Sequence, residues 1–229
     1  MKKILLLTFA FSCQYVFSQE LVKFYENAKC GYKDKATGKV VVPATYYAGS
    51  DFFTDYALVV NNNKRGFINN KGELFIPMIY DDASIFFDGL ARVTINKKNG
   101  FINKKGDVVF PLTYDFADDF VGGLARVSLN NKYGFIDNTG KVVIPLVYDD
   151  ARNFSEGMAA VKNVKWGFID NKNEVKIPFT YENAICFVKG NAAVWKDNKG
   201  IFIDVNGKWV KDQPTKKEGE GKEGKDEED

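Results

Sequence analysis

A proline recurs along the chain at an almost constant interval of 34 residues, and this repeat constrains the fold more than any other feature. Each proline is followed three residues later by a tyrosine, and each tyrosine six residues later by a phenylalanine. A period of this size is typical of repeat proteins, in which each repeat packs against its neighbours. The recurring positions are Pro43, Pro77, Pro111, Pro145 and Pro178, with Tyr46, Tyr80, Tyr114, Tyr148 and Tyr181, and with Phe52, Phe86, Phe120, Phe154 and Phe187.

Within each copy, apolar and polar residues alternate as they do in half-buried strands. Ala125, Val127 and Leu129 alternate with polar residues, which predicts a strand with one buried face. Asn130 and Asn131 follow, and they favour a tight hairpin because asparagine tolerates the positive φ that such turns require.

The rest of the copy predicts a second and a third strand. We expect the second strand over residues 134–137, followed by an Asx-type turn that ends on a glycine. Val142 and Ile144 are the expected buried positions of the third strand, and the residue between them is expected to face outward. Pro145 is expected to end this strand, because proline cannot donate to the hydrogen-bond ladder.

Each copy is therefore predicted to be a three-stranded antiparallel meander, followed by a connector whose tyrosine and phenylalanine plug the core between copies. Three strands would invert every second copy, so the connector must cross over or contain a fourth short strand. We predict an all-β fold in which tandem repeats form an open twisted array, with a closed propeller-like ring as the alternative. Five copies span the chain, and a partial sixth runs from Gly200 to Val210.

The stretches KYGFIDNTGKVVIPLVYDDARNFSEGMAAV and KWGFIDNKNEVKIP resemble the bacterial WG-repeat family, also called KWG repeats. The resemblance covers residues 22–210, although the signature Trp-Gly pair occurs only at Trp166-Gly167. It implies an all-β repeat protein without an assigned biochemical role, so it supports the fold more than the function. The positions expected to hold the repeats together are Tyr80, Phe86, Tyr114, Phe120, Tyr148, Phe154, Trp166, Gly167, Tyr181 and Phe187.

Residues 1–18 are predicted to be a signal peptide. Two lysines precede the apolar run Ile4–Phe11, and Val16-Phe17-Ser18 suits a signal-peptidase site. The run is shorter than the ~20 apolar residues that a membrane span needs. We therefore expect a secreted, periplasmic or cell-surface protein that begins at Gln19. The alternative is a lipoprotein that is acylated at Cys13.

The other end of the chain, residues 212–229, is predicted to be a disordered charged tail. It consists mainly of Lys, Glu, Asp and Gly and offers almost no apolar surface to bury. The repeat array is thus expected to span residues 19–211. Its two cysteines, Cys30 and Cys186, form no Cys-x-x-Cys motif, and an open array would keep them apart as free thiols.

The chain contains no histidine, which removes the commonest general base and the commonest zinc ligand. Paired carboxylates could serve a glycosidase, but an acid follows the tyrosine in nearly every copy, and an active site is needed only once. The Asp/Asn-x-x-Gly loops lack the bidentate glutamate of a calcium loop and indicate turns. We therefore predict no catalytic residue, metal or cofactor. The acidic pairs are Asp81-Asp82, Asp118-Asp119 and Asp149-Asp150.

The predicted function is an exported, non-catalytic scaffold for protein–protein or cell-envelope interaction. A formal net charge of +2 does not favour a nucleic-acid partner, and no membrane span is expected. The alternative is a glycan-binding module, for which Trp195 and Trp209 are candidate platforms because they do not recur at equivalent positions. A glycoside-processing enzyme that uses the paired carboxylates is the third possibility.

Overall fold

The computed structural model describes residues 20–210 of the chain. The expected signal peptide, Cys13 and the charged tail at 212–229 lie outside these residues. All the regular secondary structure of the described residues is β-strand, arranged in six separate antiparallel sheets. No helix among them is long and apolar enough to cross a membrane. The chain divides into two compact units, with the boundary between Ile79 and Tyr80.

The first unit contains two sheets, each with its strands in chain order. The first sheet has three strands: β1 (Leu21–Glu26), β2 (Lys29–Asp34) and β3 (Val40–Tyr46). The second has four: β4 (Ala48–Gly49), β5 (Tyr56–Asn61), β6 (Lys64–Asn69) and β7 (Leu74–Tyr80).

The second unit contains four four-stranded sheets, again with the strands of each in chain order. Their strands are β8 (Asp82–Ala83), β9 (Leu90–Ile95), β10 (Lys98–Asn103) and β11 (Val108–Tyr114); β12 (Phe116–Ala117), β13 (Leu124–Leu129), β14 (Lys132–Asp137) and β15 (Val142–Tyr148); β16 (Asp150–Ala151), β17 (Met158–Asn163), β18 (Lys165–Asp170) and β19 (Val175–Tyr181); and β20 (Asn183–Ala184), β21 (Asn191–Lys196), β22 (Lys199–Asp204) and β23 (Trp209–Val210).

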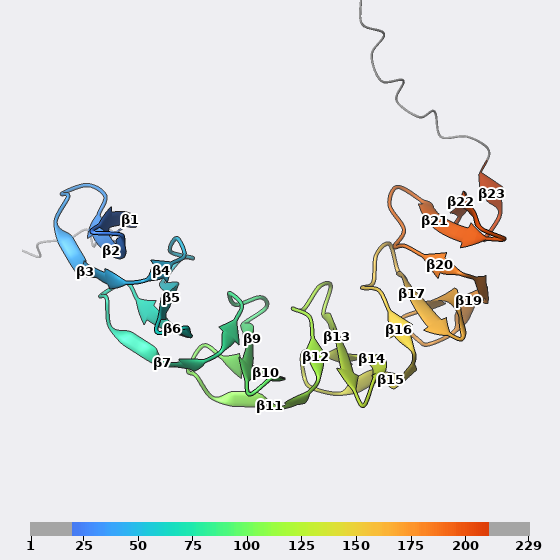
Figure 1. Cartoon of the computed structure of the whole chain (residues 1–229), viewed down its shortest axis with the longest axis horizontal. Coiled ribbons are helices and arrows are strands. Elements are labelled where there is room, and N and C mark those ends of the chain that lie inside the picture. The colour runs from blue at the N-terminus through green and yellow to red at the C-terminus, as the bar shows by residue number, and fades with distance from the viewer. Residues whose placement is uncertain (1–19, 211–229) are drawn as a thin grey trace, which may run out of the picture. The chain divides into compact units, whose positions relative to one another are not determined.

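The connector resolves the problem of the odd strand number by supplying a fourth strand. In each four-stranded sheet a two-residue strand from the connector pairs with the first long strand, as β12 does with β13 through Phe116↔Ser128. The even number of strands allows successive sheets of the second unit to keep the same orientation. In Figure 1 the sheets of the second unit, coloured green to orange-red, follow one another in chain order as the predicted array requires. The all-β, 34-residue repeat is confirmed.

The asparagine pair predicted to form a hairpin does so. Leu129 pairs with Lys132 across the turn, which leaves Asn130 and Asn131 as the two loop residues. Their φ angles are 53° and 60°, the left-handed values that a two-residue hairpin of this kind needs and that asparagine tolerates.

Pro145 does not end its strand, contrary to expectation, because β15 continues to Tyr148. The register shifts on both sides of Phe135, which pairs with Ile144, and the strand bulges around the proline. A bulge accommodates a residue that cannot donate to the ladder.

A second irregularity, the register shift between Phe135 and Ile136, overturns the predicted facing of the third strand. Ile136 pairs with Val142 whereas Phe135 pairs with Ile144, so two residues of β15 oppose one step of β14. Ile144 is fully buried, but Val142 is 47% exposed. Val143, which was expected to face outward, is partly buried and packs on the core.

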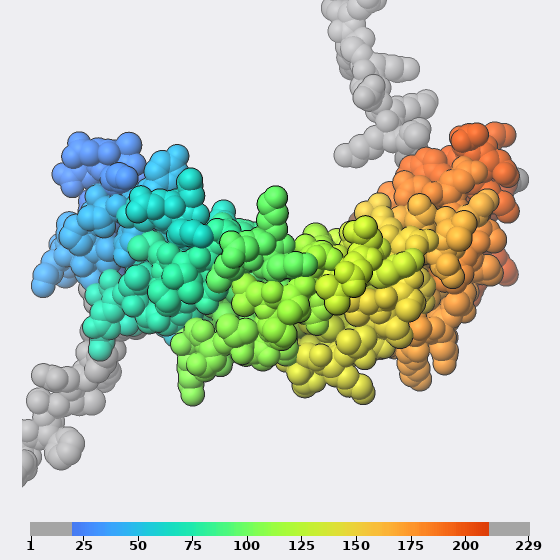
Figure 2. Space-filling view, turned by 60° about the horizontal axis from the view of Figure 1, so that its bottom comes forward, coloured from blue at the N-terminus to red at the C-terminus, as the bar shows by residue number. Residues whose placement is uncertain are grey.

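The core of the second unit lies between consecutive sheets. One buried cluster joins Leu90, Phe101 and Phe110 of the first sheet to Phe120 and Val127 of the next. The clusters further along repeat this arrangement, and the space-filling view shows a continuous surface from green to orange (Figure 2). The connector phenylalanine therefore plugs the space between sheets, as predicted.

The two cysteines of the described residues are free thiols, and their surroundings differ. Cys30 is fully buried in the first unit, and burial raises the pKa of its thiol. Cys186 is half-buried, and its Sγ lies 3.4 Å from the carbonyl oxygen of Asn153.

We expect an alkylating agent to modify Cys186 in the native protein and Cys30 only after unfolding, because the reactive thiolate of Cys30 is both inaccessible and disfavoured. Mass spectrometry of the peptides that contain each cysteine measures the two rates separately. A disulfide between Cys30 and Cys186 would contradict the expectation, since it would require the first unit to open.

Candidate binding surface

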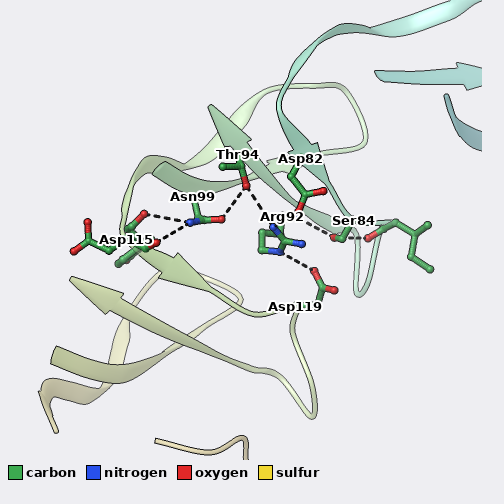
Figure 3. A network of polar contacts seen from close by, with 9 residues as sticks. Asp82, Ser84, Arg92, Thr94, Asn99, Asp115 and Asp119 are labelled. Atoms are coloured by element: carbon green, nitrogen blue, oxygen red, sulfur yellow. Dashed lines mark hydrogen bonds and ion pairs between the residues drawn. The ribbon is translucent and has the colours of Figure 1, made fainter. Parts of the chain in front are cut away.

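A polar network surrounds Arg92 on β9, on the face of the strand opposite to the buried Ala91 and Val93 (Figure 3). Its guanidinium nitrogen Nη1 lies 3.0 Å from Oδ2 of Asp82, and its Nε lies 3.7 Å from Oδ1 of Asp119. Asp82 belongs to the same sheet, whereas Asp119 belongs to the connector of the next one. Arg92 therefore ties two consecutive sheets together.

Arg126 has the equivalent role in the next repeat. Its guanidinium contacts Asp118 Oδ2 at 2.8 Å and lies 4.9 Å from the ring centre of Phe116, a cation–π contact. It also donates to the backbone carbonyl of Ala151 in the following sheet. The two carboxylates of the Asp118-Asp119 pair thus contact two different arginines. Asp118 contacts Arg126 of its own sheet, and Asp119 faces Arg92 of the preceding sheet.

An acid follows four of the five recurring tyrosines, and it caps the neighbouring hairpin. Asp115 accepts a hydrogen bond from the backbone N–H of Asn130 at 2.7 Å, and Asp149 accepts one from Val164 at 2.9 Å. Lys98 and Lys132 form ion pairs with these two acids. The hydrogen bonds from the two lysine ammonium groups, followed by those from the backbone, lower the pKa of both carboxyls. The recurrence of the acid therefore has a structural cause, as the sequence indicated.

The Asp/Asn-x-x-Gly loops, and the loop at Asp170 in which Asn173 replaces the glycine, are hydrogen-bonded turns. Oδ1 of Asp170 accepts from the backbone N–H groups of Lys172 and Glu174, both at 2.9 Å. Desolvation opposes ionisation of Asp170, but these N–H groups and the Lys176 ammonium lower its pKa to about 2. Among residues 20–210, no group of three or more His, Cys, Asp or Glu side chains is arranged to hold a metal ion.

We expect the free energy of unfolding to be nearly constant between about pH 5 and pH 8. The chain contains no histidine, so it has no side chain whose ordinary pKa lies in this range. It should fall as the pH drops from about 4 towards 2. The sign follows from the lowered pKa of Asp170: the unfolded chain takes up protons at about pH 4, and the folded one only near pH 2. Urea denaturation at a series of pH values measures this, and a maximum near pH 4 would contradict it.

The sequence-predicted structural positions lie in the core or against it. Tyr80, Phe120, Tyr148, Trp166, Gly167, Tyr181 and Phe187 are buried, while Phe86, Tyr114 and Phe154 are partly buried. The guanidinium of Arg152 lies 4.9 Å from the ring centre of Trp166.

Gly167, of the signature pair, has a role that the sequence analysis missed. A Cβ at this position would lie 2.7 Å from the carbonyl oxygen of Ile177, where β19 bulges around Pro178. A Cβ at Gly134 would come similarly close to the backbone of Ile144 and Pro145. The glycine and the proline therefore form one structural pair, and their constant separation of eleven residues in the four later copies was the signal for it.

The two candidate tryptophans both lie in the last sheet but in different surroundings. Trp195 on β21 is half-buried and covers Gly200 on the paired strand. Trp209 on β23 is 61% exposed and borders an open groove of about 360 Å³ with Lys196, Asp197 and Ile201. Trp195 is not among the residues that line this groove.

An exposed apolar side chain recurs at the start of the bulged strand in each repeat. In the second unit these residues, which we call the valine row, are Val108, Val142 and Val175. They are 53%, 47% and 52% exposed. Val40 and Leu74 hold the same position in the first unit and are also exposed.

Solved structures with some similarity to this chain include Kluyveromyces lactis Hsv2 (10% identity, TM-score 0.45), covering 82% of this chain and 72% of that one. A dihydro-heme d1 dehydrogenase, NirN, is 14% identical with a TM-score of 0.40, covering 81% and 52%. A protein of unknown function from Bacteroides caccae is 14% identical with a TM-score of 0.29, covering 84% and 92%. These low TM-scores carry no argument about the chain, and the comparison with curated proteins gives no match.

The model of the WG containing repeat matches the chain five times in tandem. The matched segments are residues 31–64, 66–98, 100–133, 133–163 and 166–199. They cover well over half of the sequence and follow the repeat of sheets and connectors described above. The chain therefore belongs to the family of WG-repeat proteins.

Proposed function

We propose that this chain is an exported, non-catalytic repeat scaffold that binds another protein of the bacterial envelope through the valine row. The observation that carries the proposal is the recurrence of Val108, Val142 and Val175 as exposed apolar residues at one equivalent position. Exposed apolar surface that is arranged rather than scattered is typical of protein-binding sites. Repeat arrays present equivalent residues of consecutive copies along one extended face.

The roles of the acidic residues support a non-catalytic function. Asp118 contacts Arg126, Asp119 faces Arg92, and Asp149 caps a hairpin turn and pairs with Lys132. A glycosidase would need one carboxyl held as an acid and another free to act on the sugar. The contacts of these carboxylates instead tie repeats and turns together.

The test is capture of proteins from the envelope fraction of the source cells by the immobilised full chain. We expect Val108→Lys, Val142→Lys and Val175→Lys, combined in one variant, to abolish capture of the specific partner. Each substitution places a charge at an exposed position, so the fold should persist. Circular dichroism and urea denaturation check this.

A matched control places the same three charges elsewhere on the same strands. Thr113, Val147 and Thr180 are exposed on β11, β15 and β19, and their lysine variants should leave capture unchanged. Equal capture by the valine-row variant and by the unchanged chain would refute the proposal.

Glycan binding is the second candidate, and the exposure of Trp209 beside a groove favours it. Aromatic platforms of this kind stack on the apolar faces of sugar rings. If the glycan is the true ligand, an array of envelope glycans will bind the chain, and Trp209→Ala will abolish binding while Trp195→Ala will not. Turnover of labelled glycans in the same assay would point to the enzyme instead.

Export itself is testable by the mass of the protein recovered outside the cytoplasm. We expect it to begin at Gln19, after cleavage behind Ser18. A lipid-modified Cys13 or a retained Met1 would contradict the proposed route.

A further inference from the structure

Each internal junction of the second unit is closed by one pair of phenylalanines. A phenylalanine in the middle of one sheet is covered by the connector phenylalanine of the next sheet. The ring centres lie 4.9 Å apart in Phe101–Phe120, 4.8 Å in Phe135–Phe154 and 4.9 Å in Phe168–Phe187. The covered rings of Phe101, Phe135 and Phe168 are at most 1% exposed.

The last sheet carries the same ring without its cover. Phe202 on β22 occupies the position of Phe168, yet it is 44% exposed. The following sequence supplies no plug, because Thr215 and Gly221 stand 34 residues after the tyrosine and phenylalanine of the preceding connector. Residues 210–229 contain no aromatic residue.

A groove of about 340 Å³ lies over Phe202. Its other lining residues include Ile185, Val188, Lys189 and Ala193, all from the last sheet and its connector. One repeat earlier, the equivalent residues are Arg152, Ser155, Glu156 and Ala160, and Ala160 belongs to the buried cluster that Phe187 fills. The groove is therefore the counterpart of the internal plug seat.

The internal junction also shows how the segment that carries the plug is held. Ser155 donates from Oγ to the carbonyl oxygen of Phe187 at 2.7 Å. The carboxylate of Glu156 accepts from the backbone N–H groups of Lys189 and Gly190, two and three residues after the plug, at 2.6 and 2.8 Å. The seat thus recognises a phenylalanine and the backbone just after it.

One substitution changes the charge of the terminal seat. Lys189 stands where Glu156 stands one repeat earlier. An ammonium cannot accept from backbone N–H groups, but it attracts a carboxylate at the same place. The terminal seat therefore favours a segment with an acid two or three residues after its phenylalanine.

We propose that the Phe202 groove binds a segment of another protein that carries phenylalanine followed by an acid at the second or third position. This inference rests on the proposed function as a protein-binding scaffold and names the chemistry of one partner. A second copy of this chain is a poorer occupant, since Phe120 and Phe187 are buried and Phe154 is packed on Phe135 in their own junctions. The exposed Phe53, which has Asp55 two residues later, is held in a tight turn with its ring stacked on Tyr56.

The chain itself provides a probe. The decapeptide YDDARNFSEG, identical to residues 148–157, contains the plug Phe154 with Glu156 two residues later. We expect a fluorescein-labelled copy to bind the full chain saturably in an anisotropy titration. Replacing its phenylalanine with alanine should weaken binding at least about tenfold, because burial of the ring supplies most of the affinity. Replacing its glutamate with lysine should also weaken binding, and the loss should grow as the salt concentration is lowered.

Two variants of the chain test the site. Phe202→Ala should abolish binding of the decapeptide, and Lys189→Glu should reverse the preference between the glutamate and lysine peptides. Both residues are surface-accessible, so the fold should remain intact; Val121→Ala, at a distant exposed position, should change nothing. The reversal by Lys189→Glu is a result that mere destabilisation would not produce.

Absence of saturation up to about 1 mM peptide, or binding that ignores both variants, would overturn the inference. Self-association of the chain that Phe202→Ala abolishes would overturn it too and assign the groove to a second copy. Envelope capture through the valine row is measured independently. If capture persists while the decapeptide fails to bind, only this inference fails; if both fail, the proposed function fails with it.

Discussion

Replacing Phe120 with alanine is expected to lower the free energy of unfolding by about 3–5 kcal/mol, a large share of the 5–15 kcal/mol of an ordinary domain. Phe120 is only 4% exposed. Its ring centre lies 4.9 Å from that of Phe101 and 6.2 Å from that of Phe110, and both of these rings belong to the preceding sheet. The variant therefore leaves a cavity at a junction between repeats.

Urea denaturation followed by tryptophan fluorescence measures the loss. Val121→Ala is the matched control, because the next residue is 54% exposed and its truncation should change stability by less than about 0.5 kcal/mol. Asp115→Ala removes the carboxylate that caps the hairpin at Asn130, and we expect a smaller loss than for Phe120→Ala because that carboxylate is exposed to solvent. Equal losses for Phe120→Ala and Asp115→Ala would contradict the assignment of core and surface.

The elements set by local rules could be predicted from the sequence. The Phe120 plug follows from the period of the repeat, since a large apolar residue in every connector has no other place to be buried. The hairpin at Asn130 and Asn131 follows from backbone preference alone. Each depends on neighbours in the chain or on equivalent positions, and both kinds of information are present in a repetitive sequence.

The two register shifts of β15, one around Pro145 and one at Val143, could not be predicted from the alternation of apolar residues. Period-2 patterning assumes an unbroken strand, and a single extra residue reverses which side chains face the core. Val142 and Val143 were for this reason assigned to the wrong faces. The physical indicator was the pairing of each proline with a glycine on the strand beside it, because the glycine admits the bulged backbone.

The contacts of Arg92 and Arg126 lay beyond sequence reasoning for a different reason. The two arginines hold equivalent positions, but their acidic partners do not. Arg92 contacts Asp82 and Asp119, whereas Arg126 contacts Asp118. Long side chains reach several partners, and geometry alone selects among them. The exposure of Phe202, by contrast, could be predicted from the sequence, since no tyrosine or phenylalanine follows it at the interval of the repeat.

Gly49→Ala is expected to destabilise the first unit by about 1–3 kcal/mol or more, although it only adds a methyl group. The new Cβ would overlap the hydroxyl of Tyr32 and lie 3.2 Å from Sγ of Cys30. Tyr32 is fully buried and donates its hydroxyl hydrogen to the carbonyl oxygen of Ser50 at 2.9 Å, so it has little room to move. The two departures of the first copy, tyrosine for phenylalanine and glycine for alanine, are thus one compensated exchange.

A double-mutant cycle tests this coupling. Tyr32→Phe alone should cost about 1 kcal/mol, because the Ser50 carbonyl loses its donor. In that background Gly49→Ala should become neutral or stabilise by up to about 1 kcal/mol, since alanine restricts the unfolded chain. Additive losses in urea denaturation would show that the two positions are independent.

The reverse exchange in a central repeat provides a matched control. Phe135 and Ala151, which share one buried cluster, hold the positions of Tyr32 and Gly49. Phe135→Tyr should therefore be strongly destabilising, since its hydroxyl would meet the Ala151 methyl group, and adding Ala151→Gly should restore much of the loss. Recovery in both repeats would establish that ring size and the facing small residue are selected together at each junction, because a close-packed interface leaves no space for either change alone.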